Sequence, residues 1–138
     1  MEIQERSNVT YRVYDFARRD KNGNLRPLHI DKSVEVANLN PVHLSGRPEQ
    51  VISDTPDAKT ELLRETEYFH VYSWKVKTEA QMDVNDESFW ALMNVAGTAE
   101  IACGSEKMTL RQGDSIFVPA GAGTVTISGE CQVIGARL

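Results

Sequence analysis

The chain has 138 residues, of which 41% are hydrophobic and 25% charged, and its formal net charge is −5. This length suits one ordinary domain with a single core, and the composition is that of a soluble globular protein. The negative charge argues against nucleic acid and membranes as partners, and no apolar run is long enough to span a bilayer. The opening residues, MEIQER, lack the features of a signal peptide, and two cysteines, Cys103 and Cys131, are too few for a disulfide framework. We therefore expect a cytoplasmic protein with reduced cysteines.

Residues 8–16 (NVTYRVYDF) alternate in character and are rich in β-branched and aromatic side chains, which predicts a strand. Side chains alternate across a strand, so two faces are expected. The apolar face would hold Val9, Tyr11 and Val13, and the polar face Thr10, Arg12 and Tyr14.

A polar turn at residues 20–24 separates this segment from a predicted helix over residues 27–37, whose first turn holds a proline. Residues 40–60 contain three prolines and one glycine without a sustained period, so we expect a long loop there. These features divide the chain into an N-terminal part, 1–60, with a strand, a short helix and a loop, and a second part, 61–138.

The second part reads as a series of short strands joined by glycine-containing turns, because seven of the nine glycines lie from Gly97 onward. Such a pattern predicts a mainly β protein with an antiparallel sandwich or barrel, and one short helix in the N-terminal third. The expected strands are 68–76, 89–95, 99–103, 107–110, 115–118, 124–127 and 132–134.

The motif GDSIFVPAG at residues 113–121 is similar to the second motif of the cupins, a glycine followed after five residues by Pro-x-Gly. A plain turn, strand and second turn in some other β-barrel would read the same way. We predict a cupin-type antiparallel β-barrel, or jelly roll.

This barrel is predicted to be free of metal. Metal-binding cupins carry a histidine three residues after Pro-x-Gly, where this sequence has Thr124, and a His-x-His pair that is absent here. Glu67 and His70 have the spacing of a helical ligand pair, but in a strand they would point to opposite faces. We read all three histidines, His29, His43 and His70, as ordinary side chains.

The sequence as a whole resembles the shorter bacterial type I mannose-6-phosphate isomerases, and the resemblance covers nearly the entire chain. Its specific part is the N-terminal block, since the cupin motif alone is weak. The matching stretches are Ile3-Gln4, residues 8–16, NGN at 22–24, LHIDKS at 28–33, EYF at 67–69, NVAG at 94–97 and the motif at 113–121.

The resemblance implies two cupin barrels in the full-length family, with zinc held in the first by a Gln-x-His pair, a glutamate and a histidine. The last of these ligands would directly precede the segment that opens this sequence, so none maps onto it and no cofactor is expected in this chain. The resemblance carries over one active-site residue, Arg12, as a catalytic arginine. Thr10 and Tyr14 share its predicted face and are expected to bind substrate. Without the resemblance, Arg12 would be read as a surface arginine on an edge strand.

Two functions remain open. In the first, the chain is the C-terminal domain or a truncated form of an enzyme that interconverts mannose 6-phosphate and fructose 6-phosphate, and it is inactive alone. In the second, it is a stand-alone metal-free cupin that binds a small ligand or a partner. A sugar phosphate could be attracted by Arg18, Arg19, Lys21 and Arg26, but we favour a solvated loop face for these charges.

A homodimer is also expected. The apolar residues of the first segment would form an exposed strand edge, which two copies could cover around a two-fold axis. The segment could instead fold back on its own barrel or stay disordered. The residues concerned are Ile3, Val9, Tyr11, Val13 and Phe16.

Overall fold

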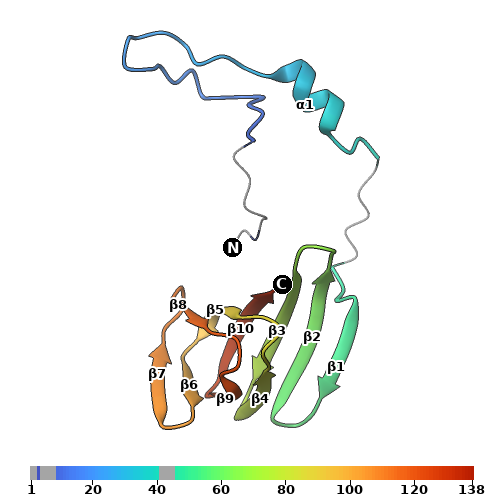
Figure 1. The fold of residues 1–138 in the computed structure, drawn as a ribbon, viewed down its shortest axis with the longest axis vertical. Helices are drawn as coiled ribbons and strands as arrows, with labels where there is room; N and C mark the ends of the chain where they lie inside the picture. The colour runs from blue at the N-terminus through green and yellow to red at the C-terminus, as the bar shows by residue number, and fades with distance from the viewer. Residues whose placement is uncertain (1–2, 4–8, 41–45) are drawn as a thin grey trace. The chain divides into compact units, whose positions relative to one another are not determined.

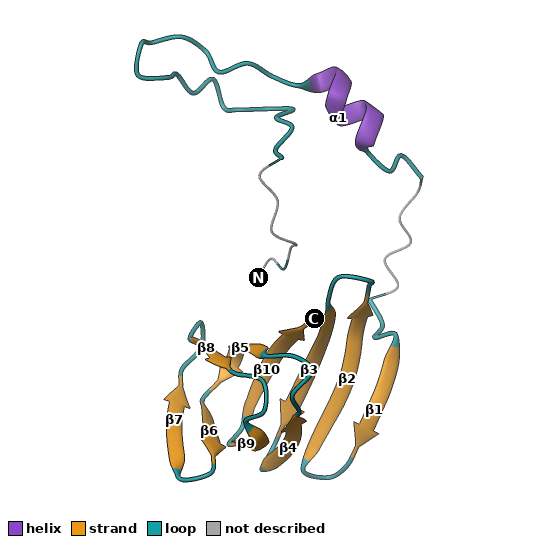
Figure 2. Ribbon diagram, viewed as in Figure 1, coloured by secondary structure: helices purple, strands orange, loops and turns teal. Residues whose placement is uncertain are grey.

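The computed structural model describes residues 3, 9–40 and 46–138. The chain divides into two compact units, one of residues 4–45 and one of residues 46–138 together with Ile3. Figure 2 shows that the described strands belong to the second unit and the helix to the first.

The unit of residues 46–138 is built from ten strands in its described part, and every pairing between them is antiparallel (Figure 1). The strands are β1 (Gln50–Asp54), β2 (Ala58–Glu65), β3 (His70–Val76), β4 (Glu79–Val84), β5 (Trp90–Gly97), β6 (Ala99–Cys103), β7 (Glu106–Leu110), β8 (Ser115–Val118), β9 (Gly123–Ser128) and β10 (Cys131–Arg137).

The strands form one sheet of six, in the order β1-β2-β3-β10-β5-β8, and one sheet of four, in the order β4-β9-β6-β7. Consecutive strands repeatedly change sheets, which is the connectivity of a jelly roll. The predicted mainly β, antiparallel jelly roll with one short helix is thus confirmed. The backbone ladders run within each sheet, so the two sheets face each other without joining into a continuous closed barrel.

The core lies between the two sheets and follows from the two-residue period of the strands. In β4, for example, Ala80, Met82 and Val84 are buried while the residues between them are exposed. Leu92 and Ile127 are among the most completely buried side chains, one from each sheet. Burying such a side chain contributes about 1.5–3 kcal/mol, so the apolar inner faces hold the sheets together.

An aromatic cluster fills the six-stranded side of this core. The ring centroid of Trp74 lies 5.9 Å from that of Tyr72 and 5.3 Å from that of Trp90. Gly135 on the neighbouring strand makes room for it, because a Cβ there would lie 2.7 Å from Cζ3 of Trp74. The missing side chain at residue 135 is therefore a packing requirement of the cluster.

The expected loop over residues 40–60 is wrong from residue 50 onward, because β1 and the start of β2 form a hairpin there. All five residues of β1 are exposed, and its sequence, QVISD, does not alternate between apolar and polar residues. The strand exists because β2 pairs with it, and Pro56 lies in the turn between them, where it removes no ladder hydrogen bond.

The unit of residues 4–45 contains helix α1 (Ile30–Val36), which lies within the predicted helix but begins three residues after Pro27. The expected strand over residues 8–16 is wrong in its described part, since residues 9–16 form no strand. Among the described residues, the backbone of Arg12 forms hydrogen bonds with His29, and no sheet forms around it. No helix in the described residues is long and apolar enough to cross a membrane.

Candidate functional site

A cluster of charged side chains lies between residues 12 and 26. The chain turns sharply after Asp15, where Phe16 and Ala17 both adopt positive φ values, 50° and 52°. A second turn follows at Asp20, whose Oδ1 accepts hydrogen bonds from the backbone N–H groups of Asn22 and Asn24. These two turns fold the segment back on itself and bring later residues to Asp15.

The Asp15 side chain is 5% exposed and is surrounded by three arginines. Arg26 donates to both carboxylate oxygens, with Nε 2.6 Å from Oδ2 and Nη2 on Oδ1. Arg18 Nη2 lies 3.2 Å from Oδ1, and Arg12 Nε lies 3.6 Å from the same oxygen. Three cations around one anion leave an excess of positive charge, which favours an anionic ligand.

The arginines also set the protonation of the carboxyl group. The hydrogen bonds from Arg26, followed by the charges of Arg26, Arg18 and Arg12, lower the pKa of Asp15, and burial opposes them only in part. The same contact raises the pKa of Arg26. Asp15 is therefore a carboxylate throughout the neutral range and cannot serve as a proton donor there.

Arg12, the predicted catalytic residue, is held at several points. Its backbone N–H donates to Nδ1 of His29 at 3.1 Å, and its carbonyl oxygen accepts the backbone N–H of His29 at 2.7 Å. Its Nη1 donates to the carbonyl oxygen of Pro27 at 3.2 Å. The Arg12 side chain is 23% exposed, so it is fixed by the protein and still reachable by a ligand.

The two predicted substrate-binding residues are both exposed, but the structure places them differently. Tyr14 lines a small hollow of about 140 Å³ together with Asp15, Arg18 and Arg26. Thr10 does not line that hollow. Because residues 9–16 form no strand, the alternation that grouped Thr10 and Tyr14 with Arg12 does not apply.

Sequence reasoning missed Asp15 as a site residue and read Arg18 and Arg26 as parts of a solvated loop face. One feature could have revealed Asp15, namely a lone carboxylate in the aromatic run from Tyr14 to Phe16 with arginines soon after it. Two of the remaining basic residues lie outside the cluster. Arg19 donates to the carbonyl oxygen of Gly23 at 2.6 Å, and Lys21 is exposed.

The interior of the jelly roll offers no polar site at the position of the cupin histidine. Thr124, which occupies that position by spacing, is exposed on β9, whereas Val125 is fully buried and points between the sheets. The neighbouring inward positions Met82 and Val84 of β4 are also buried and apolar. The inward positions around residue 125 are therefore apolar.

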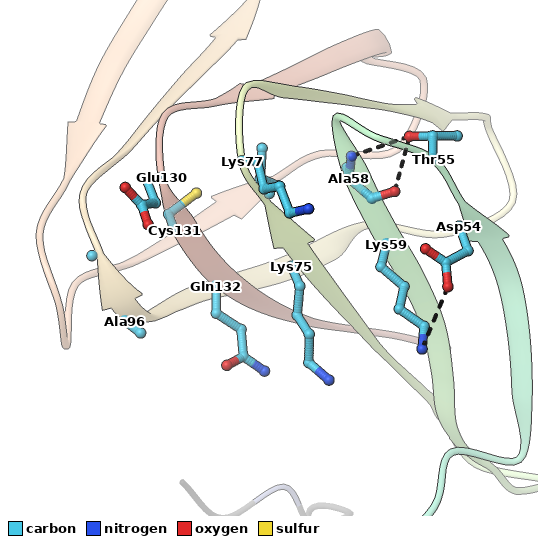
Figure 3. A pocket seen from close by; sticks show the side chains of 12 residues that line it. Asp54, Thr55, Ala58, Lys59, Lys75, Lys77, Ala96, Glu130, Cys131 and Gln132 are labelled. Atoms are coloured by element: carbon cyan, nitrogen blue, oxygen red, sulfur yellow. Dashed lines mark hydrogen bonds and ion pairs between the residues drawn. The ribbon is translucent and has the colours of Figure 1, made fainter.

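A second cluster lies over β2, β3 and β10, beside a hollow of about 690 Å³ lined by Lys59, Lys75, Lys77 and Gln132 (Figure 3). In Figure 3 the side chains of Lys59, Lys75 and Gln132 extend to the same side of the strands. Glu61 is buried between the first two, with its oxygens 3.1 Å from Lys59 Nζ and 2.9 Å from Lys75 Nζ. Lys59 and Lys75 thus each have a carboxylate partner, and Asp54 and Glu130 also line the hollow, so it has no excess of charge comparable to that around Asp15.

Comparison with known proteins identifies the family. A profile described as "Mannose-6-phosphate isomerase, cupin domain" matches residues 58–137. The chain belongs to this family. The crystal structure of the mannose 6-phosphate isomerase from Bacillus subtilis matches with a TM-score of 0.75 and 32% identity, over 96% of this chain and 41% of that chain.

Relatives of this mannose-6-phosphate isomerase cupin domain match along its whole length. The Bacillus subtilis protein YvyI is 34% identical over 138 residues, which is 100% of this chain and 43% of its own length. The mannose-6-phosphate isomerase of Streptococcus mutans is 30% identical over 143 residues, covering 99% of this chain and 42% of its own length. The chain therefore spans less than half the length of these relatives.

The described residues do not fit the zinc that the resemblance implies for the full-length family. In residues 9–40 and 46–138, no group of three His, Cys, Asp or Glu side chains could hold a metal ion. His29 is engaged with Arg12, and Nε2 of His70 lies 3.9 Å from Glu65, a single carboxylate. The prediction for His43 lies outside the described residues. A metal for this mannose-6-phosphate isomerase cupin domain would need ligands from elsewhere.

Proposed function

We propose that this chain is the C-terminal part of a mannose-6-phosphate isomerase and contributes Arg12 to the site where mannose 6-phosphate and fructose 6-phosphate are interconverted. The carrying observation is that Arg12 is held at its backbone and side chain while staying partly exposed, within a cluster that has surplus positive charge. Similarity along the whole chain to isomerases more than twice its length supports this assignment.

The role proposed for Arg12 follows from its chemistry. Aldose–ketose isomerisation passes through an enediolate-like state, so negative charge develops on the sugar oxygens. A guanidinium stays charged and offers a rigid fork of donors, which suits the stabilisation of that charge. Tyr14, at the neighbouring hollow, and Thr10 are proposed to contact the sugar phosphate through their hydroxyl groups.

The chain alone is proposed to be inactive, because its described residues supply neither metal ligands nor a carboxylate that can exchange a proton near neutral pH beside Arg12. The test is to measure bound zinc and isomerase activity for the chain alone and after mixing with a metal-binding first barrel. We expect well under one equivalent of zinc and no turnover alone, and turnover after mixing. Stoichiometric zinc that survives dialysis against a chelator, or turnover by the chain alone, would contradict the proposal.

Arg12→Lys in the mixed protein tests the arginine itself. An ammonium ion cannot reproduce the fork of donors, so the variant should lose most of the turnover while the same amount of zinc remains bound. Near-normal turnover would remove Arg12 from the mechanism. Arg19→Lys is the matched control, because Arg19 contacts a backbone carbonyl outside the cluster.

A second candidate function is a small-ligand-binding module without metal. It is favoured by one observation, a mainly apolar hollow of about 420 Å³ lined by residues that include Cys103, Met108 and Phe117. A lack of turnover after mixing, combined with binding of an apolar probe there, would favour this candidate.

A further inference from the structure

We infer that Asp15 is a positioning residue, which holds Arg12 and its neighbours in the geometry that binds the phosphate-bearing sugar. This inference rests on the proposed function of Arg12. Asp15 holds the arginines although its negative charge weakens their attraction for an anion, so its presence needs an explanation other than charge.

The contacts show that Asp15 is the common centre of the cluster. Arg26 donates to both carboxylate oxygens in a bidentate contact, which is the strongest and most directional form of this ion pair. Oδ1 then faces Arg18 and Arg12 as well. Since one carboxylate contacts all three guanidinium groups, its removal would take a contact from three long side chains at once.

The backbone next to Asp15 forms a strained turn that places Arg18 against it. Two successive non-glycine residues, Phe16 and Ala17, hold positive φ values directly after Asp15, and each such conformation costs roughly 1 kcal/mol or more. The turn lets the backbone N–H of Arg18 donate to the Asp15 carbonyl oxygen at 2.9 Å. Arg18 Nε lies 3.4 Å from the same oxygen, so the side chain is drawn back over Asp15.

The arrangement leaves donors for a ligand. Of the Arg12 guanidinium, Nε faces Asp15 and Nη1 faces Pro27. Within the described residues Nη2 has no such partner, so its two N–H groups are available to an anion. Asp15 therefore reduces the net positive charge of the cluster by one unit, and it also orients the guanidinium group of Arg12.

Charge and geometry make opposite predictions for Asp15→Asn. The variant keeps the size of the side chain and removes one negative charge. If the cluster attracted the sugar phosphate by charge alone, Asp15→Asn would bind it at least as tightly as the unaltered chain. If affinity depends instead on arginines that are already ordered, the variant binds more weakly, because its arginines must be ordered when the ligand binds.

The test is a titration of the full 138-residue chain, labelled with ¹⁵N, with mannose 6-phosphate at constant ionic strength, followed through the amide and arginine Nε–H resonances. We expect Asp15→Asn to weaken binding by about fivefold or more, in line with the cost of ordering several long side chains. Asp20→Asn is the matched control, with the same charge change in the same segment on a carboxylate that holds a turn. It should bind as the unaltered chain does, or slightly more tightly.

The outcomes separate the two proposals. No binding by the unaltered chain would overturn the proposed sugar-phosphate site, and with it any positioning role for Asp15. Binding by the unaltered chain that is equal or tighter in Asp15→Asn would overturn the positioning role alone. If amide dispersion shows that Asp15→Asn unfolds residues 9–40, Asp15→Glu decides, since it keeps the charge and displaces the oxygens. It too should bind more weakly, and unchanged affinity would count against the inference.

Discussion

The side-chain amide of Asn94 donates to the carbonyl oxygen of Leu110 at 3.0 Å, in the fully buried space between the two sheets. Asn94 belongs to β5 of the six-stranded sheet and Leu110 ends β7 of the four-stranded sheet. The same Nδ2 donates to the carbonyl oxygen of Gly97 at 2.8 Å. One buried amide group thus connects the two sheets at this end of the sandwich.

Asn94→Ala should lower the free energy of unfolding by about 1–3 kcal/mol, because it leaves the Leu110 carbonyl buried without this partner. Urea unfolding followed by circular dichroism measures the change. Gln112→Ala is the control, since Gln112 Nε2 donates to the carbonyl oxygen of Val95 at an exposed position, and it should cost less than about 0.5 kcal/mol. Equal losses in the two variants would show that burial at residue 94 is not the cause.

Gly97 is the glycine that tolerates a side chain least. A Cβ there would lie 2.1 Å from the carbonyl oxygen of Glu130, and the residue has a φ of 69°. Gly97→Ala must displace backbone as well as accept a strained φ, so we expect a loss of about 3 kcal/mol or more in unfolding free energy. Gly104→Ala has a similar φ of 57° with open space around it, and it should cost only about 1 kcal/mol. A difference below experimental error would contradict the steric argument.

Glu61 predicts a dependence of stability on pH. Hydrogen bonds from Lys75 and then Lys59 lower the pKa of Glu61 below its ordinary value of 4.5. The stabilisation from this ionised group is complete above that value and is lost as the pH falls through the lower pKa of the folded state. Glu61→Gln should therefore be less stable than the unaltered chain at pH 7, and the difference should shrink as the pH is lowered below about 4.5.

Thermal unfolding at intervals between pH 7 and pH 2.5 would measure this convergence. Glu100→Gln serves as the control, because Glu100 contacts a single lysine at the surface and exposed pairs contribute about 0–1 kcal/mol. A Glu61→Gln difference that stays constant across the range would show that the ionisation of Glu61 is not involved.

Self-association through the N-terminal segment remains a prediction. The strand edge that first suggested it is not formed in residues 9–16, but Val13 and Phe16 are exposed by 57% and 73%. We expect light scattering to give a mass that rises towards that of a dimer as concentration increases. Val13→Asp combined with Phe16→Asp, or deletion of residues 1–16, should keep the protein monomeric. A dimer that persists in both variants would place the contact elsewhere.

The sequence predicted the second half of the fold well because each strand there carries its own pattern. All seven strands expected between residues 68 and 134 are present, with small shifts at their ends. β4 was missed although Ala80, Met82 and Val84 alternate with exposed residues, so its pattern was readable. β1 was not readable, because an exposed edge strand depends on its partner β2 and not on its own apolar residues.

The candidate site was predicted less completely. Resemblance to the family pointed to Arg12, but the grouping with Thr10 and Tyr14 depended on a strand that does not form. The alternating pattern of residues 9–16 lacks a neighbouring strand within the described part of its unit, and a strand without a partner is not stable. The cluster around Asp15 depends on two turns, which bring Arg26 into contact with Asp15, eleven residues earlier in the sequence. No local sequence pattern specifies this contact.

The position of the aromatic cluster has an optical consequence. The chain contains two tryptophans, Trp74 and Trp90, and both lie in the sandwich core with their ring centroids 5.3 Å apart. Intrinsic tryptophan emission therefore reports only on residues 46–138, and the close pair should give an exciton couplet in far-ultraviolet circular dichroism. Loss of that signal marks the melting of the sandwich, while Tyr11 and Tyr14 belong to the other unit. Tyr68 and Tyr72 lie in the sandwich unit, so tryptophan, and not tyrosine, follows one unit by itself without an added label.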